Sequence, residues 1–168
     1  ANIGYPNLDE RIRSTYAAKS TATLAKGLYD SYIRAIRWAS DRISQDEGGV
    51  VAFISNGAWL DSSAGSGIRR CFEEEFTSIY VLNLRGNQRT SGELSRKEGG
   101  KIFGSGSRTP ITITFLVKNP AKKDQKAIIQ YHDICDYLTR EQKLKMIKDF
   151  RSISSQKLEW QIITPNEK

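Results

Sequence analysis

Residues 48–60 read Gly48-Gly49-Val50-Val51-Ala52-Phe53-Ile54-Ser55-Asn56-Gly57-Ala58-Trp59-Leu60, and this stretch decides the fold. Two glycines end a helix, an apolar run follows, and a small polar turn closes it. A short apolar run bounded by turn residues is typical of a strand buried on both faces, as in parallel sheets covered by helices. Ligands of such sheets bind beyond the carboxyl ends of the strands, so we expect Ser55 and Asn56 near that edge.

Composition fits one globular domain. The chain has 168 residues, of which 38% are hydrophobic and 27% charged, and no apolar run approaches the length of a bilayer span. The two cysteines, Cys71 and Cys135, lack metal-ligand spacing and indicate reduced thiols in a cytoplasmic protein. The single histidine, His132, cannot build a metal site with these cysteines, and its place in a predicted strand argues against a Ser-His-Asp site. The opening at Ala1 reads like the middle of a loop and indicates a piece of a longer protein.

The chain carries a basic excess, with 26 Lys and Arg against 19 Asp and Glu and a net charge of +7. Such an excess suits a polyanionic partner. Charge alone leaves the alternative of a merely basic globular protein equally open.

Alternating helix and strand patterns surround the opening stretch. Residues 1–26 are polar and indicate an arm or insertion loop with a short helix over 9–16, and residues 27–168 form the domain proper. Apolar residues at spacings of three and four predict helices over 28–43 and 67–76, the second burying Ile68, Cys71, Phe72 and Phe76. A strand over 78–84 then implies a parallel crossover from the strand at 50–54.

The second half of the chain predicts two strands and a helix. The strands, over 111–118 and 127–134, are separated by a short turn and predict an antiparallel hairpin. Thr139 and Gln142 form a capping box that opens a helix burying Leu144, Ile147 and Phe150. The predicted fold class is therefore α/β, with a mostly parallel sheet, an antiparallel hairpin at its end and helices on both faces.

Residues 84–108 show no periodicity and are rich in glycine and positive charge. Loops of this length inside a compact domain are usually functional or disordered, and this composition suits a phosphate backbone. The glycines at 104 and 106 precede a strand, whereas phosphate-loop and dinucleotide motifs need glycines that open a helix, so both motifs are excluded.

The order of these segments resembles adenine-N6 DNA methyltransferases. Residues 27–32 and 48–60 are similar to the helix, Gly-Gly and strand that follow the catalytic motif of that family. The later helix at 68–76, the strand at 79–84, Lys101-Ile102-Phe103 and the strand at 109–117 continue the match. Within this family, the amino-acid sequences of residues 84–90 and 101–108 most resemble those of type ISP restriction-modification enzymes, which join a helicase and a methyltransferase in one chain. The likeness covers about residues 27–119.

This sequence lacks two motifs of the family, and their absence limits what the resemblance implies. The family's Asn/Asp-Pro-Pro-Tyr/Phe tetrapeptide and its glycine-rich motif for S-adenosylmethionine are absent, and both lie upstream in such enzymes. The chain thus resembles the carboxyl-terminal half of the catalytic domain, and the amino-terminal half, together with further domains, would be its partner. The resemblance implies S-adenosylmethionine as cofactor of the intact enzyme, with none bound by this part alone. It also implies double-stranded DNA as substrate, no membrane, and no methyl transfer by this part alone.

The resemblance also suggests site residues. Phe103 matches the residue that packs against the flipped adenine, and the alternative is a core aromatic that begins a strand. Tyr29, Ser55 and Asn56 would line the pocket, without a catalytic residue among them. Phosphate contacts would come from Arg85, Arg89, Arg96, Lys97, Lys101 and Arg108, each of which could instead belong to a solvated loop. The rival hypothesis for the whole chain is a non-catalytic nucleic-acid-binding or docking module.

Overall fold

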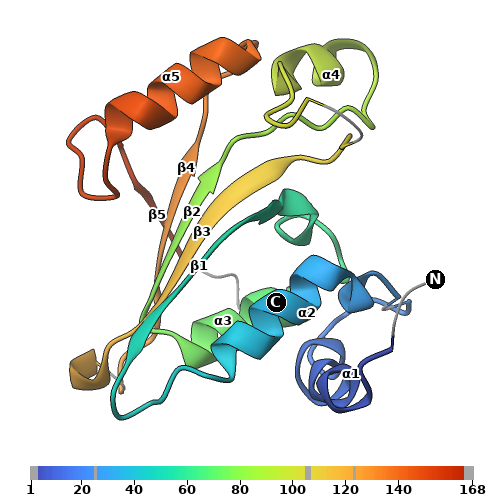
Figure 1. The fold of residues 1–168 in the computed structure, drawn as a ribbon, viewed down its shortest axis with the longest axis vertical. Helices are drawn as coiled ribbons and strands as arrows, with labels where there is room; N and C mark the ends of the chain where they lie inside the picture. The colour runs from blue at the N-terminus through green and yellow to red at the C-terminus, as the bar shows by residue number, and fades with distance from the viewer. Residues whose placement is uncertain (1–3, 25, 105–106, 123, 165–168) are drawn as a thin grey trace. The chain divides into compact units, whose positions relative to one another are not determined.

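The computed structural model describes residues 4–24, 26–104, 107–122 and 124–164, and its five strands form one sheet in the order β1-β3-β2-β4-β5 (Figure 1). The strands are β1 (Gly49–Asn56), β2 (Ser78–Asn83), β3 (Ile111–Lys118), β4 (Ile128–Asp133) and β5 (Gln161–Ile163). The α-helices are α1 (Pro6–Ile12), α2 (Ser31–Ser40), α3 (Ser66–Glu75), α4 (Gly92–Glu98) and α5 (Arg140–Phe150). Shorter helical turns are η1 (Arg13–Ala17), η2 (Lys26–Tyr29), η3 (Gly57–Trp59) and η4 (Pro120–Lys122).

The α/β class with helices around a sheet is confirmed, and β1 and β2 run in the same direction, as the predicted crossover requires, but the predicted mostly parallel pairing of neighbouring strands is wrong. The sheet is mostly antiparallel, and β2 and β4 form its parallel pair. The cause is the position of β3, which lies between β1 and β2 and runs against both. The predicted hairpin of 111–118 with 127–134 is therefore wrong, because β2 separates β3 from β4; the antiparallel pair at the end of the sheet is β4 with β5.

Strand β1 is not buried on both faces, contrary to the prediction for residues 50–54. Val51 and Ser55 are buried, whereas Val50 and Ile54 are 55% and 60% exposed. Side chains alternate across a strand, so Val50 and Ile54 share one face, and β1 is the last strand of the sheet within the described residues. The continuous apolar run at residues 50–54 therefore belongs to a strand that has one buried face and one exposed apolar face.

Two compact units divide the chain. The first comprises residues 1–53, 58–79 and 115–128, and the second comprises residues 54–57, 80–114 and 129–168. In the first unit, the predicted apolar face of α3 is buried, and the Phe72 ring makes edge contacts with Tyr16, Trp59 and Phe76. The short helix expected near the amino terminus is present as α1 and η1, and its Ile12 and Tyr16 are buried.

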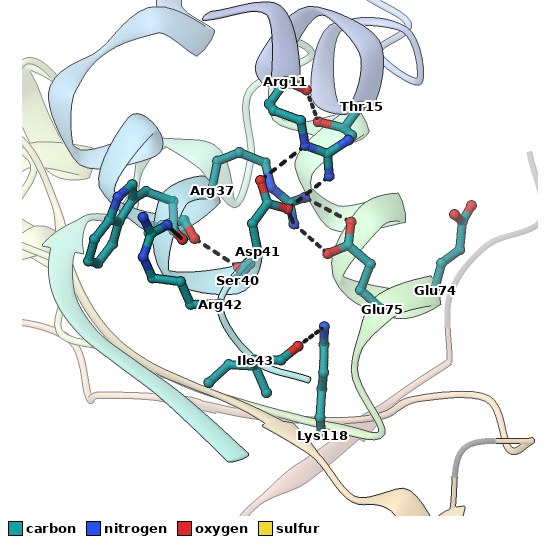
Figure 2. Close-up of polar contacts among 12 residues, drawn as sticks. Arg11, Thr15, Arg37, Ser40, Asp41, Arg42, Ile43, Glu74, Glu75 and Lys118 are labelled. Atoms are coloured by element: carbon teal, nitrogen blue, oxygen red, sulfur yellow. Dashed lines mark hydrogen bonds and ion pairs between the residues drawn. The ribbon is translucent and has the colours of Figure 1, made fainter. Parts of the chain in front are cut away.

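A buried arginine joins the helices of the first unit (Figure 2). Arg37 of α2 is 1% exposed, and its two terminal nitrogens donate to both Glu75 oxygens of α3 at 2.8 and 2.7 Å. Arg37 Nη2 also donates to Asp41 Oδ1 at 2.7 Å. Arg11 of α1 donates to the same carboxylate, from Nε to Oδ2 at 3.0 Å and from Nη2 to Oδ1 at 2.8 Å. These arginines hold the pKa of Asp41 below its usual value, although partial burial acts in the opposite direction. The charges are matched, as an interior ion requires.

The second unit has its own core. It consists of residues from β2, the loop before β3, β3, the segment after β4, α5 and the carboxyl-terminal segment: Leu82, Leu84, Ile102, Ile111, Ile134, Phe150 and Leu158. The predicted capping box of α5 is confirmed, with Gln142 N donating to Thr139 Oγ1 at 3.2 Å and Thr139 N donating to Gln142 Oε1 at 2.8 Å. Of the predicted apolar face, Phe150 is buried but Leu144 is exposed.

Neither cysteine forms a disulfide, as the sequence predicts. Burial raises the pKa of the Cys71 thiol to about 11, which keeps it protonated, and Cys135 is exposed. None of the helices in the described ranges combines the length and apolar character that crossing a bilayer requires.

We predict that Arg37→Met destabilises the first unit by about 3 kcal/mol or more, because Glu75 loses its partner while remaining partly buried. Urea unfolding of the purified protein measures this change. The control is Arg13→Met, whose exposed pair with Glu10 should contribute less than about 1 kcal/mol. Equal, small effects of the two substitutions would contradict a structural role for Arg37.

Candidate nucleic-acid interface

The basic segment at 84–108 lies in the second unit and contains helix α4. It leaves β2 through Arg85 and Gly86, which have positive φ angles of 55° and 89°. The Arg85 backbone N–H donates to Asn83 Oδ1 at 3.0 Å, which helps to hold this turn. No side chain of α4 is buried, so the helix is not held in place by a hydrophobic face of its own.

Arg85 is paired with carboxylates rather than open to solvent. Its Nε and Nη2 donate to the two oxygens of Asp133, both at 2.7 Å, and Nη1 pairs with Asp136. These carboxylates raise the pKa of Arg85 further above its usual value. A bidentate pair is a strong, directional tie. Arg85 as a phosphate contact stays a prediction, but the structure uses its charge to hold the loop to the segment that includes the end of β4.

Lys143 of α5 is the second tie and lies fully buried, with 0% exposure. Its ammonium donates to three backbone carbonyls: Leu84 at 2.9 Å, Glu98 at 2.7 Å and Gly100 at 2.9 Å. An ammonium has three hydrogens, so these acceptors match its donors. Burial lowers the pKa of Lys143 to about 8. This role of Lys143 was not predictable from the sequence, because a lysine in an amphipathic helix usually faces solvent.

Close backbone packing fixes the segment just before Phe103. A Cβ on Gly99 would lie 2.2 Å from the Leu138 carbonyl oxygen, and Gly99 has a positive φ of 67°. The Gly100 N–H donates to the same oxygen at 2.8 Å. Arg140 Nε then donates to the Ile102 carbonyl at 2.8 Å. The beginning of α5 and the residue pair before it thus support the backbone from Gly99 to Ile102.

Phe103 lies on the surface. Its neighbour Ile102 belongs to the core, whereas Phe103 is 50% exposed, and β3 begins only at Ile111. The alternative of a core aromatic that begins a strand is therefore wrong. A half-exposed aromatic next to a tightly held backbone offers a ring that a planar ligand could stack on.

Most of the other side chains predicted to contact phosphate are exposed at the surface. Arg89 and Arg108 are exposed, and Arg108 Nη2 donates to the Gln88 carbonyl at 2.9 Å. Lys101 is half-buried. Arg96 makes an exposed pair with Glu93 at 3.1 Å, and Lys97 lies 3.9 Å from Asp136. Exposed pairs are weak, so these side chains could turn to a phosphate at little cost.

The predicted pocket wall is divided between the units. Ser55 is buried and Asn56 half-buried at the end of β1, in the second unit, and the next amide, Gly57 N, donates to Pro110 O at 2.9 Å. This bond joins the polar turn to the end of the basic segment. Tyr29 belongs to the first unit, where it is half-buried at the end of η2. The described ranges contain no group of three His, Cys, Asp or Glu suited to a metal ion.

Comparison with known proteins identifies relatives among solved structures. No family model and no curated protein matches the chain. It is 48% identical, with a TM-score of 0.91, to part of a nuclease-deletion mutant of the type ISP restriction-modification enzyme LlaGI, solved with a DNA substrate mimic. It is 40% identical, with a TM-score of 0.91, to part of the ATP-dependent type ISP enzyme LlaBIII bound to DNA. A DrdV–DNA complex matches at 36% identity and a TM-score of 0.88.

These likenesses cover 99% of this chain but only 15%, 11% and 15% of the LlaGI, LlaBIII and DrdV chains. The chain therefore spans only a small share of the length of each of these proteins. At this identity the likeness extends beyond fold to much of the sequence, and the type ISP resemblance is supported.

The lowered pKa of Lys143 predicts a pH dependence of stability. An unfolded lysine keeps a pKa near 10.5, so between pH 8 and 10.5 the unfolded chain binds more protons than the folded one. The contribution of Lys143 to the free energy of unfolding therefore rises with pH across that window, by about 3 kcal/mol in total. Chemical unfolding of the unsubstituted protein and Lys143→Met, from pH 7.5 to 10.5, measures the difference. A difference independent of pH would contradict the burial of a charged ammonium.

Proposed function

We propose that this chain is the carboxyl-terminal half of the catalytic domain of an adenine-N6 DNA methyltransferase in a restriction-modification protein. The observation that carries the proposal is the exposed Phe103 on a backbone held by Lys143 and Arg140. Support comes from the likeness to restriction-modification enzymes whose structures contain DNA. The DNA in those structures is bound by those enzymes, and the extension to methylation of adenine by this protein rests on the order of its segments from residue 27 to 119.

In this proposal the chain supplies the wall of the target-base pocket and the DNA contacts. An adenine must leave the duplex before its amino group can be methylated. Phe103 stacks on the extruded base, whatever hydrogen-bonding edge that base presents. The surface cations around it neutralise phosphates of the flanking backbone. Ser55 and Asn56 serve as wall rather than as catalytic groups.

The described residues do not by themselves fit S-adenosylmethionine. Such a cofactor is held by a glycine-rich turn between a strand and a helix. Here Gly48 and Gly49 precede β1, and Gly99 and Gly100 follow α4. The connection from β1 to α3 and the first turn of α3 do contain glycines, but a Cβ on Gly65 would lie 2.1 Å from the Trp59 carbonyl oxygen and one on Gly67 1.8 Å from the Tyr16 carbonyl oxygen, so the chain's own backbone fills the space beside them. We therefore propose that the cofactor site and the catalytic tetrapeptide belong to the amino-terminal half of the domain. By itself this part would transfer no methyl group.

We predict that Phe103→Ala in the full-length protein lowers methyl transfer to DNA at least tenfold while changing the DNA Kd less than threefold, because the base loses its stacking partner. Labelled-methyl incorporation and fluorescence anisotropy measure the two quantities. Leu94→Ala, which also removes an exposed apolar side chain of the second unit, is the control and should change neither. Weaker binding with proportionate loss of turnover would favour the rival, a non-catalytic nucleic-acid-binding module.

A second prediction concerns the surface charges. Replacing Arg89, Lys101 and Arg108 by Gln should reduce the slope of log affinity against log salt by about 2 to 3, since each lost phosphate contact removes roughly 0.9. Binding titrations at several salt concentrations give this slope. The control replaces Arg13 and Lys145, exposed cations outside the segment. An unchanged slope would indicate that the segment has only a structural role.

A further inference from the structure

Resting on the proposed function, we propose that Lys143 is a positioning residue for the target base: its ammonium gathers three loop carbonyls and so holds Phe103 at the surface. Lys143 lies on α5, outside the segment that contacts DNA in the proposal. It acts on the base only through the loop.

The three acceptors come from separate points of the chain. The Leu84 carbonyl follows β2, the Glu98 carbonyl ends α4, and the Gly100 carbonyl lies three residues before Phe103. One side chain therefore joins the start of the segment to the end of α4 and to Gly100. The Gly86 N–H also donates to the Glu98 carbonyl, at 3.2 Å, which draws the entry turn to the same point.

Polar interactions have to fix α4 and the turns beside it, because the residues of this segment that reach the apolar core, Leu84 and Ile102, lie outside the helix. Helix α4 buries none of its side chains. The bonds that hold it to the surrounding segment include Gln88 Nε2 to the Gly99 carbonyl at 3.1 Å and the Asn87 N–H to Glu98 Oε2 at 2.8 Å. Among these, only the bonds of Lys143 come from a fully buried charge. Hydrogen bonds from a charged donor in a dry environment are the strongest of this set.

Loss of the ammonium would remove its bonds to the Leu84 and Gly100 carbonyls, whereas the Glu98 carbonyl would keep the bond from the Gly86 N–H. Each unpaired buried carbonyl is costly, and the segment can regain partners by moving toward water. Because Gly100 lies only three residues before Phe103, a shift of the backbone at Gly100 would also displace the Phe103 ring. A methionine at position 143 keeps the apolar stem but donates nothing, so it removes the tie without opening a large cavity.

The test compares Lys143→Met with Lys145→Met, an exposed lysine on the same helix, in the full-length protein. Amide hydrogen exchange should become at least tenfold faster at Gly86 and Gly100 in Lys143→Met and stay unchanged at Thr77, whose N–H bonds Val117 in the first unit. Methyl transfer at saturating DNA should fall about tenfold, with DNA affinity changed less than threefold. Lys145→Met should match the unsubstituted protein in all three measurements.

Unchanged exchange at Gly86 and Gly100, or unchanged turnover, overturns the inference. Equal acceleration at Thr77, with binding and turnover lost together, overturns it too, since this is the signature of general destabilisation. If Lys143→Met fails to fold, Arg140→Met decides: it removes only the bond to the Ile102 carbonyl from an exposed side chain and should lower turnover about threefold without changing affinity. An unsubstituted protein that transfers no methyl group refutes the proposed function instead, and the exchange measurement still decides whether Lys143 holds the loop.

Discussion

Backbone carbonyls that are buried must find donors, and in the second unit one ammonium serves three of them. The rest of the basic segment depends on this constraint, because α4 buries no side chain and the glycines at 99 and 100 let the backbone approach α5 closely. The consequence is an ordered surface loop in which Ile102 is in the core and Phe103 is not. Order of this kind is what a base-stacking residue requires, since a mobile ring would lose part of its stacking energy to conformational entropy.

The first unit meets a similar constraint by different chemistry. Arg37 is as buried as Lys143, but its partners are carboxylates, Glu75 and Asp41, and not backbone carbonyls. Matched carboxylates leave that site with little net charge, whereas carbonyl dipoles leave the charge of Lys143 in place. This difference explains why burial lowers the pKa of Lys143 to about 8, while the carboxylates around Arg37 keep it fully charged. Each unit thus has an interior cation suited to its role, one joining helices and one organising a loop.

Local pattern made much of this fold predictable. The apolar face of α3 and the capping box at Thr139 followed from spacing alone, and each proved correct because a single element determines it. Strand order was not predictable, since the position of β3 between β1 and β2 depends on pairing between distant segments. The exposure of Val50 and Ile54 was missed for the same reason: an apolar run does not reveal whether both faces are covered. The residues of the candidate site were predictable from the sequence, but their contacts were not. Phe103 and the cations followed from sequence and resemblance, whereas the partners of Arg85 and the burial of Lys143 depend on tertiary contacts.

An exposed aromatic on a held backbone, a cationic surface and a likeness to DNA-bound restriction-modification enzymes together support the proposal that the protein containing this chain methylates adenine in DNA. The decisive experiment is single-molecule sequencing of DNA from cells that express the full-length protein, in a host without its own adenine methylation. We expect N6-methyladenine at one recurring sequence, and none when Phe103 is alanine. DNA without modified adenine in cells that contain the folded protein, or with methylation confined to cytosine, would contradict it.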